Sequence, residues 1–302
     1  SNMINTDTIT PAVIETLESK AKDAADALLL IREQGMAKAH LSKDGTPEHV
    51  LFTKLPFVKN GNPNTPESIA KLKQFGSYLQ QEIDAVVFLG VGGSYLGNKV
   101  LFDIFAGSGW NVGCEKRRHG YPRVYFSGNN LDVDQYSEVV DEVEYLATHR
   151  LGKNEQFRVL LVPISKSGTT LETLAAFSYF YEQCQKSSLL QMEVAVVTDL
   201  DEDISPLYNL AKENVWQCFD IKEGIGGRFC IFSDPGLITA AAIGMDIDAF
   251  LCGARDMENA CQSASLGENP ALLNAVLKYA AAEKGVDEIE ALNTIDPLRK
   301  RR

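Results

Sequence analysis

Between residues 65 and 221, short apolar runs alternate with amphipathic segments, and this alternation limits the chain to few folds. Each amphipathic segment carries apolar residues at helical spacing, whereas each apolar run is continuous. Continuous runs are typical of strands covered on both faces, and helical connections between them make neighbouring strands parallel. We therefore predict an α/β fold, a doubly wound αβα sandwich with a five-stranded parallel sheet. The five runs are "DAVVFLG" (84–90), "RVYFSG" (123–128), "RVLLVPIS" (158–165), "EVAVVT" (193–198) and "VWQCFDI" (215–221).

The two ends of the chain predict helices outside this sandwich. Apolar residues recur at helical spacing from residue 11 to 39, and after residue 235 the pattern is helical throughout. A segment rich in Pro, Gly and Asn follows the first helix. We expect three parts: an N-terminal helix with an ordered lead-in (1–64), the αβα domain (65–245), and C-terminal helices with a tail (246–302).

The charge of the chain limits its partners. With 29 basic and 41 acidic residues, the formal net charge is −12, which repels nucleic acid and anionic membranes. No apolar run approaches the length of a transmembrane helix. The six cysteines form no CxxC pair and lack clustered histidines, so we expect reduced thiols in a cytoplasmic protein and no metal site. A small anion would have to bind through a local site.

The first candidate motif is "GVGGSYLG" (90–97), between the first predicted strand and its helix. Glycines allow close approach of a ligand, and a helix N-terminus offers N–H groups to an anion. A dinucleotide fingerprint requires a glycine at the position of Tyr95, so this motif is excluded. A P-loop requires a lysine directly after its last glycine, but Asn98 separates Gly97 from Lys99, so this motif is excluded as well. The remaining interpretations are a glycine-rich anion loop that includes Ser94, and a plain tight turn.

The second motif is "ISKSGTTLET" (164–173), after the third predicted strand. Ser165, Ser167, Thr169 and Thr170 place four hydroxyls beside Lys166 at the start of a helix. One hydroxyl is enough to cap a helix, so capping is the simpler alternative. Hydroxyls together with free backbone N–H groups also suit the oxygens of a phosphate monoester, and we favour this interpretation.

The third motif is "GIGGRFCIFSDPG" (224–236), after the last predicted strand. We expect Gly226 and Gly227 to hold Arg228 on an extended backbone. Arg228 could pair with a carboxylate of this acidic chain. Alternatively, its fixed guanidinium could stabilise negative charge that develops on an oxygen during a reaction.

Together, these three motifs resemble the sugar-phosphate loops and the arginine signature of the glucose-6-phosphate isomerase family. The resemblance covers about residues 50–285 and departs at Cys230, where the family usually has a hydroxyl residue. It implies reversible interconversion of glucose 6-phosphate and fructose 6-phosphate through an enediolate, a cytoplasmic step of glycolysis and gluconeogenesis. It also implies a homodimer for the full-length protein, and no metal or organic cofactor.

The resemblance also implies roles for individual residues. The phosphate would be held by Ser94, Ser165, Ser167 and Thr170, with Gly93 and Lys166 beside it. Arg228 and the backbone of Gly227 would face the C1–C2 end of the sugar, which makes Arg228 the candidate catalytic residue. Glu172 would lie near the sugar without an assigned step, and the turn "GNNLD" (128–132), with Asn129, Asn130 and Asp132, would be structural.

The resemblance further implies a missing component. The family's general base is a glutamate C-terminal to the arginine motif, and this chain ends 74 residues after Arg228, at residue 302. Glu288 and Glu290 do not match that motif, and we interpret them as solvated carboxylates. We therefore expect a truncated chain that is inactive alone. The alternatives are a non-catalytic sugar-phosphate-binding module of the same fold, or a relative that isomerises another phosphosugar or transfers an amino group.

Overall fold

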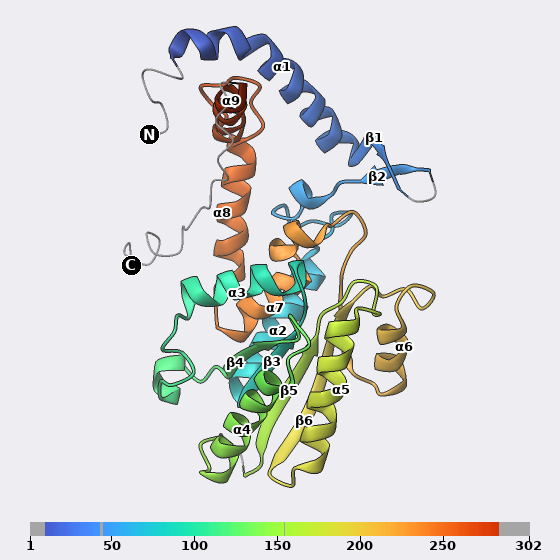
Figure 1. Cartoon of the computed structure of the whole chain (residues 1–302), viewed down its shortest axis with the longest axis vertical. Helices are drawn as coiled ribbons and strands as arrows, with labels where there is room; N and C mark the ends of the chain where they lie inside the picture. The colour runs from blue at the N-terminus through green and yellow to red at the C-terminus, as the bar shows by residue number, and fades with distance from the viewer. Residues whose placement is uncertain (1–9, 43–44, 154, 284–302) are drawn as a thin grey trace.

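The computed structural model describes residues 10–42, 45–153 and 155–283, and its centre is a five-stranded parallel sheet (Figure 1). The strand order is β4-β3-β5-β6-β7, and every neighbouring pair is parallel. This confirms the predicted fold class and all five strands. The strands are β3 (Ala85–Leu89), β4 (Arg123–Ser127), β5 (Phe157–Pro163), β6 (Leu190–Thr198) and β7 (Gln217–Asp220).

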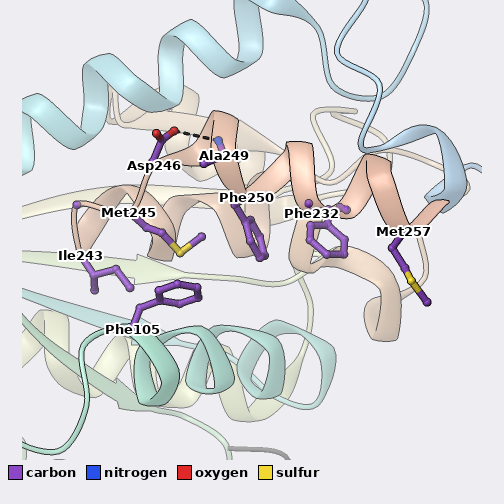
Figure 2. Close-up of a pocket in the computed structure, with 11 residues that line it drawn as sticks. Phe105, Phe232, Ile243, Met245, Asp246, Ala249, Phe250 and Met257 are labelled. Atoms are coloured by element: carbon purple, nitrogen blue, oxygen red, sulfur yellow. Dashed lines mark hydrogen bonds between the residues drawn. The ribbon is translucent and has the colours of Figure 1, made fainter. Parts of the chain in front are cut away.

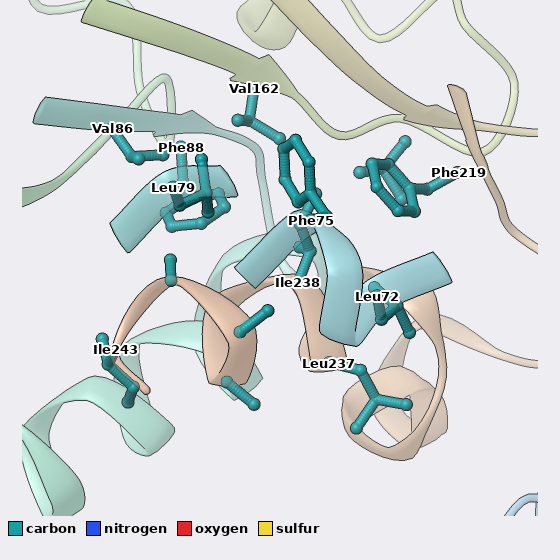
Figure 3. Close-up of a cluster of buried hydrophobic side chains, with 14 of the residues drawn as sticks. Leu72, Phe75, Leu79, Val86, Phe88, Val162, Phe219, Leu237, Ile238 and Ile243 are labelled. Atoms are coloured by element: carbon teal, nitrogen blue, oxygen red, sulfur yellow. The ribbon is translucent and has the colours of Figure 1, made fainter. Parts of the chain in front are cut away.

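Helices cover both faces of this sheet. On one face, residues of α2, α3, α7 and α8 pack against Val86, Phe88 and Val162, and Figure 3 shows part of this cluster. On the other face, α4, α5 and α6 pack against Val87 and Leu161. Both faces of the strands are therefore buried, which explains their continuous apolar runs. The helices are α2 (Pro66–Glu82), α3 (Gly93–Phe105), α4 (Val133–Thr148), α5 (Leu171–Lys186), α6 (Pro206–Glu213), α7 (Asp234–Ala242) and α8 (Ile247–Ala260).

The N-terminal and C-terminal helices meet away from the sheet. Figure 1 shows α8 leading from the sandwich to α9 (Pro270–Glu283), which lies beside α1 (Pro11–Gln34). Leu17 and Ala21 of α1 are buried in the same apolar cluster as Leu272 and Val276 of α9. None of the described helices combines the length and apolar character needed to span a bilayer.

The first helix is shorter than the sequence predicts. It ends at Gln34 because Gly35 adopts φ 69° and donates its N–H to the carbonyl of Ile31 at 2.7 Å, a typical helix C-terminus. Residues predicted as its last turn instead begin β1 (Met36–Leu41), which pairs antiparallel with β2 (Pro47–His49). Pairing within the hairpin outweighs the helical spacing here.

Candidate functional site

A cavity of about 440 Å³ lies where the loops after β3 and β5 meet the segment after β7. This is the carboxyl end of the parallel strands, where ligands bind in open α/β sheets. All seven residues predicted to bind substrate line this one cavity, so the structure brings them together. They are Gly93, Ser94, Ser165, Lys166, Ser167, Thr170 and Gly227.

The loop after β3 turns sharply into α3. Gly92 precedes the helix with φ 55° and ψ −116°, a conformation that favours glycine. The N–H of Ser94 donates to the carbonyl of Val91 at 3.1 Å, which closes the turn. Ser94 is thereby held in the first turn of α3, at the edge of the cavity.

The loop after β5 is tied to the neighbouring strand β6. The N–H of Ser165 donates to the carbonyl of Val197 at 3.0 Å, and the N–H of Asp199 donates to the carbonyl of Lys166 at 3.2 Å. Gly168 has φ 63°, and a Cβ atom there would lie 2.2 Å from Oγ of Ser205. Only glycine fits this position, so the path of the hydroxyl loop is fixed.

The hydroxyls of this loop bond to one another rather than capping α5. Thr170 is the N-cap residue, yet within the described residues its side chain accepts no capping hydrogen bond. Its Oγ1 lies 2.7 Å from Oγ of Ser165, and Oγ of Ser167 lies 2.9 Å from Oγ1 of Thr169. The first-turn N–H groups of α5 therefore have no hydroxyl cap, and an uncapped helix N-terminus favours an anion.

Thr173 is a further lining residue that the sequence analysis did not single out. Its side chain is 0% exposed, and its Oγ1 has no hydrogen-bond partner among the described residues. It stands three residues after Thr170, so both lie on the same side of the start of α5. That spacing was the available signal for including it.

Two backbones touch directly at the far side of the cavity. A Cβ atom on Gly93 would lie 2.2 Å from the carbonyl oxygen of Gly227 and 2.5 Å from its Cα atom. The loop after β3 and the segment after β7 can approach this closely only because Gly93 lacks a side chain. This contact brings the third motif to the other two.

Arg228 lies beside the cavity but does not line it, and its backbone differs from the prediction. Gly226 is extended, but Gly227–Phe232 forms a 3₁₀ helix, η3, so Arg228 is not on an extended backbone. The N–H of Phe229 donates to the carbonyl of Gly226 at 2.9 Å, which begins this turn. Arg228 is exposed, and no ion pair joins it to another residue in the described part of the chain.

The remaining residues of the motifs have different surroundings. Asp132 caps α4 by accepting hydrogen bonds from the N–H groups of Asp134 and Gln135 at 3.2 and 3.3 Å, in agreement with a structural turn. Glu172 lies in the first turn of α5 but does not line the cavity. Glu288 and Glu290 lie outside the described residues.

Lys166 is the only charged residue among the described residues that line the cavity. Within the same part of the chain, no group of three or more His, Cys, Asp or Glu residues is arranged to hold a metal ion. The cavity therefore offers hydroxyls, backbone N–H groups and one ammonium group, a set of donors suited to an anion.

A larger cavity, of about 730 Å³, is apolar and lies elsewhere (Figure 2). Phe105, Phe232, Met245 and Phe250 contribute to its wall. Asp246, an acidic residue of this wall, accepts a hydrogen bond from the N–H of Ala249 at 3.0 Å and so caps α8. The smaller cavity, although less than two thirds as large, is the better candidate for a polar ligand.

Comparison with known proteins identifies the relatives of this chain. The family model described as phosphoglucose isomerase matches residues 67–293. Curated glucose-6-phosphate isomerases from Clostridioides difficile (strain 630) and Acetivibrio thermocellus are 32% and 30% identical over 232 residues. Each alignment covers 76% of this chain and 49% of the relative, so the chain spans about half the length of these relatives.

A solved structure agrees with the fold. The crystal structure of a hypothetical protein from Thermus thermophilus has a TM-score of 0.62 and 24% sequence identity. The similarity covers 89% of this chain and 54% of that protein. At this identity, the likeness shows a shared fold and nothing about the ligand.

Proposed function

Because this chain belongs to the phosphoglucose isomerase family, we propose that it forms the phosphate-binding part of a site that interconverts glucose 6-phosphate and fructose 6-phosphate. The observation that carries this proposal is the single cavity lined by hydroxyls of two separate loops. The family is one of aldose–ketose isomerases. The full reaction is proposed for a complete protein, since this chain spans about half of its curated relatives.

The phosphate would lie at the N-terminus of α5. Ser94, Ser165, Ser167 and Thr170 can turn their O–H groups towards it, and the helix dipole favours its charge. Lys166 adds one positive charge at the rim. Thr173 is a further donor, because its hydroxyl, which has no partner among the described residues, would gain a hydrogen bond when the anion binds.

Arg228 and the backbone of Gly227 would act at the other end of the sugar. Isomerisation moves a proton between C1 and C2 through an enediolate, so negative charge develops on the sugar oxygens. A guanidinium is always charged and can stabilise such an oxygen. Among the described residues we assign no general base to this reaction.

The first test of the proposal is phosphate binding. We expect glucose 6-phosphate and inorganic phosphate to bind the chain, and the double variant Ser165→Ala/Thr170→Ala to bind both at least about 10-fold more weakly. Each lost hydrogen bond to a charged group costs about 1.5–3 kcal/mol. Isothermal titration calorimetry measures the affinities. The control is Ser77→Ala, which removes an exposed hydroxyl on α2 whose hydrogen bond, among the described residues, goes to the carbonyl of Lys73. Equal affinities for the double variant and the wild type would contradict the site.

A second titration tests Arg228. We expect Arg228→Ala to weaken binding of a sugar-acid phosphate, whose planar carboxylate resembles an enediolate, by about 10-fold or more, and to leave inorganic phosphate binding within about 3-fold. Inorganic phosphate reports on the phosphate end of the site alone, whereas the sugar-acid phosphate also reports on the end near Arg228. If the variant binds the sugar-acid phosphate as tightly as the wild type does, Arg228 is not the electrophile, and the non-catalytic binding module becomes the better interpretation.

A further inference from the structure

The thiol of Cys230 lies between two of the segments that form the cavity. Cys230 belongs to η3 and is 5% exposed. Its Sγ lies 3.0 Å from the carbonyl oxygen of Gly227 and 3.4 Å from the carbonyl oxygen of Gly93. A thiol has one hydrogen, which these two carbonyls can share. Cys230 is thus a hydrogen-bond donor to a residue of its own turn and to Gly93, the first residue of α3, directly after the loop that follows β3.

These two glycines connect the thiol to the wall of the cavity. Gly93 and Gly227 both line it, and their backbones touch where the two segments meet. Ser94 follows Gly93 directly, so a shift of the loop after β3 would move its hydroxyl relative to the hydroxyl loop after β5. No covalent bond or ion pair among the described residues joins the two segments at this point. The thiol of Cys230 connects the two segments instead, through its contacts with both carbonyls.

We propose that Cys230 is a positioning residue, which holds the loop after β3 against η3 and thereby aligns Ser94 with the other hydroxyls of the phosphate site. This inference rests on the proposed function for its effect on binding. Burial raises the pKa of the Cys230 thiol to about 11, so at neutral pH the group is a protonated donor and not a thiolate nucleophile. A serine hydroxyl at this position can make the same donation.

Three variants test the proposal. Cys230→Ala removes the donor, and Cys230→Ser restores it with a smaller atom. Cys184→Ala is the control: Cys184 on α5 is also 5% exposed, burial raises its pKa to about 11 as well, and within the described residues no hydrogen bond involves its sulfur. Both alanine variants lose a buried sulfur, but only one loses the link between the two segments.

The first measurement is the affinity for glucose 6-phosphate, by calorimetry. We expect Cys230→Ala to bind about 10-fold more weakly, Cys230→Ser to bind within about 3-fold of the wild type, and Cys184→Ala to bind normally while losing a comparable amount of stability towards urea. If Cys230→Ala binds like the wild type, or if Cys184→Ala weakens binding equally, the thiol has only a packing role and the proposal is overturned.

The second measurement does not depend on the ligand. Hydrogen exchange of the N–H of Leu96, which donates to the carbonyl of Gly92 at 2.8 Å, reports on the junction between the loop after β3 and the first turn of α3. We expect about 10-fold faster exchange there in Cys230→Ala, recovery in Cys230→Ser, and no change in β5. Unchanged exchange would overturn the positioning role even if sugar phosphate fails to bind. Failure of the wild type to bind would contradict the proposed function alone.

Discussion

Replacement of Thr173 by valine is expected to stabilise the free protein and to weaken its binding of phosphate. The hydroxyl of Thr173 is fully buried and has no hydrogen-bond partner among the described residues. Valine has nearly the same shape and removes this unpaired group, which should raise the free energy of unfolding by about 1 kcal/mol. The same change removes a donor from the proposed phosphate site, so affinity should fall about 10-fold. Urea unfolding and calorimetric titration measure the two effects.

Thr239→Val provides the matched control. Thr239 lies on α7, is also 0% exposed, and its Oγ1 likewise lacks a partner in the described part of the chain, but it does not line the cavity. We expect the same gain in stability and an unchanged affinity for phosphate. If both threonine variants keep full affinity, Thr173 is not a phosphate ligand. If Thr173→Val loses stability, its hydroxyl already has a structural partner.

A gain in stability together with a loss of phosphate affinity, as expected for Thr173→Val, follows from a general property of binding sites. A ligand-binding donor without a partner in the free protein costs free energy, because a polar group is then buried without a hydrogen bond. Ser165 and Thr170 avoid this cost because their hydroxyls bond to each other at 2.7 Å. Thr173 has no such neighbour among the described residues. This difference makes it the more informative position to change.

The sheet could be predicted from the sequence because its signal is repeated and local. All five apolar runs became strands, and their order along the chain, together with helical connections, required parallel pairing. The same rule placed the loops after β3 and β5 at one end of the sheet, which is why Ser94 and Ser167 were expected together and line one cavity.

Other features depend on contacts that are distant in sequence. The 3₁₀ turn at Gly227 and the sulfur contact of Cys230 with Gly93 bring together segments that lie 137 positions apart, and no periodicity encodes them. The hairpin after α1 was missed because its residues continue the helical spacing as far as residue 39, although Gly35 already ends the helix. Thr173 was missed for a different reason: it lies inside the predicted helix, and only its spacing of three residues from Thr170 connects it with the hydroxyl loop.

Gly93→Ala is expected to be the most damaging single substitution at the site. The added Cβ would lie 2.2 Å from the carbonyl oxygen and 2.3 Å from the carbonyl carbon of Gly227, and both are backbone atoms that cannot rotate away. The loop after β3 and η3 must therefore separate. We expect a loss of about 3 kcal/mol in the free energy of unfolding, the range of severe overpacking, and at least a 10-fold loss of phosphate affinity.

Alanine at the other glycine of this contact should have only a mild effect on stability. A Cβ atom on Gly227 would lie 3.5 Å from Cα of Gly93, an ordinary van der Waals distance, so Gly227→Ala should cost less than about 1 kcal/mol. Gly253→Ala, within α8, places its Cβ more than 4 Å from every described heavy atom beyond the adjacent residues and the backbone of its own helix, and should gain up to about 1 kcal/mol from helix propensity. Urea unfolding measures the stability of the three variants, which we expect to fall in the order Gly253→Ala, Gly227→Ala, Gly93→Ala. Equal losses for Gly93→Ala and Gly227→Ala would mean that the two segments do not meet with this geometry, because only a directional contact makes one alanine far worse than the other.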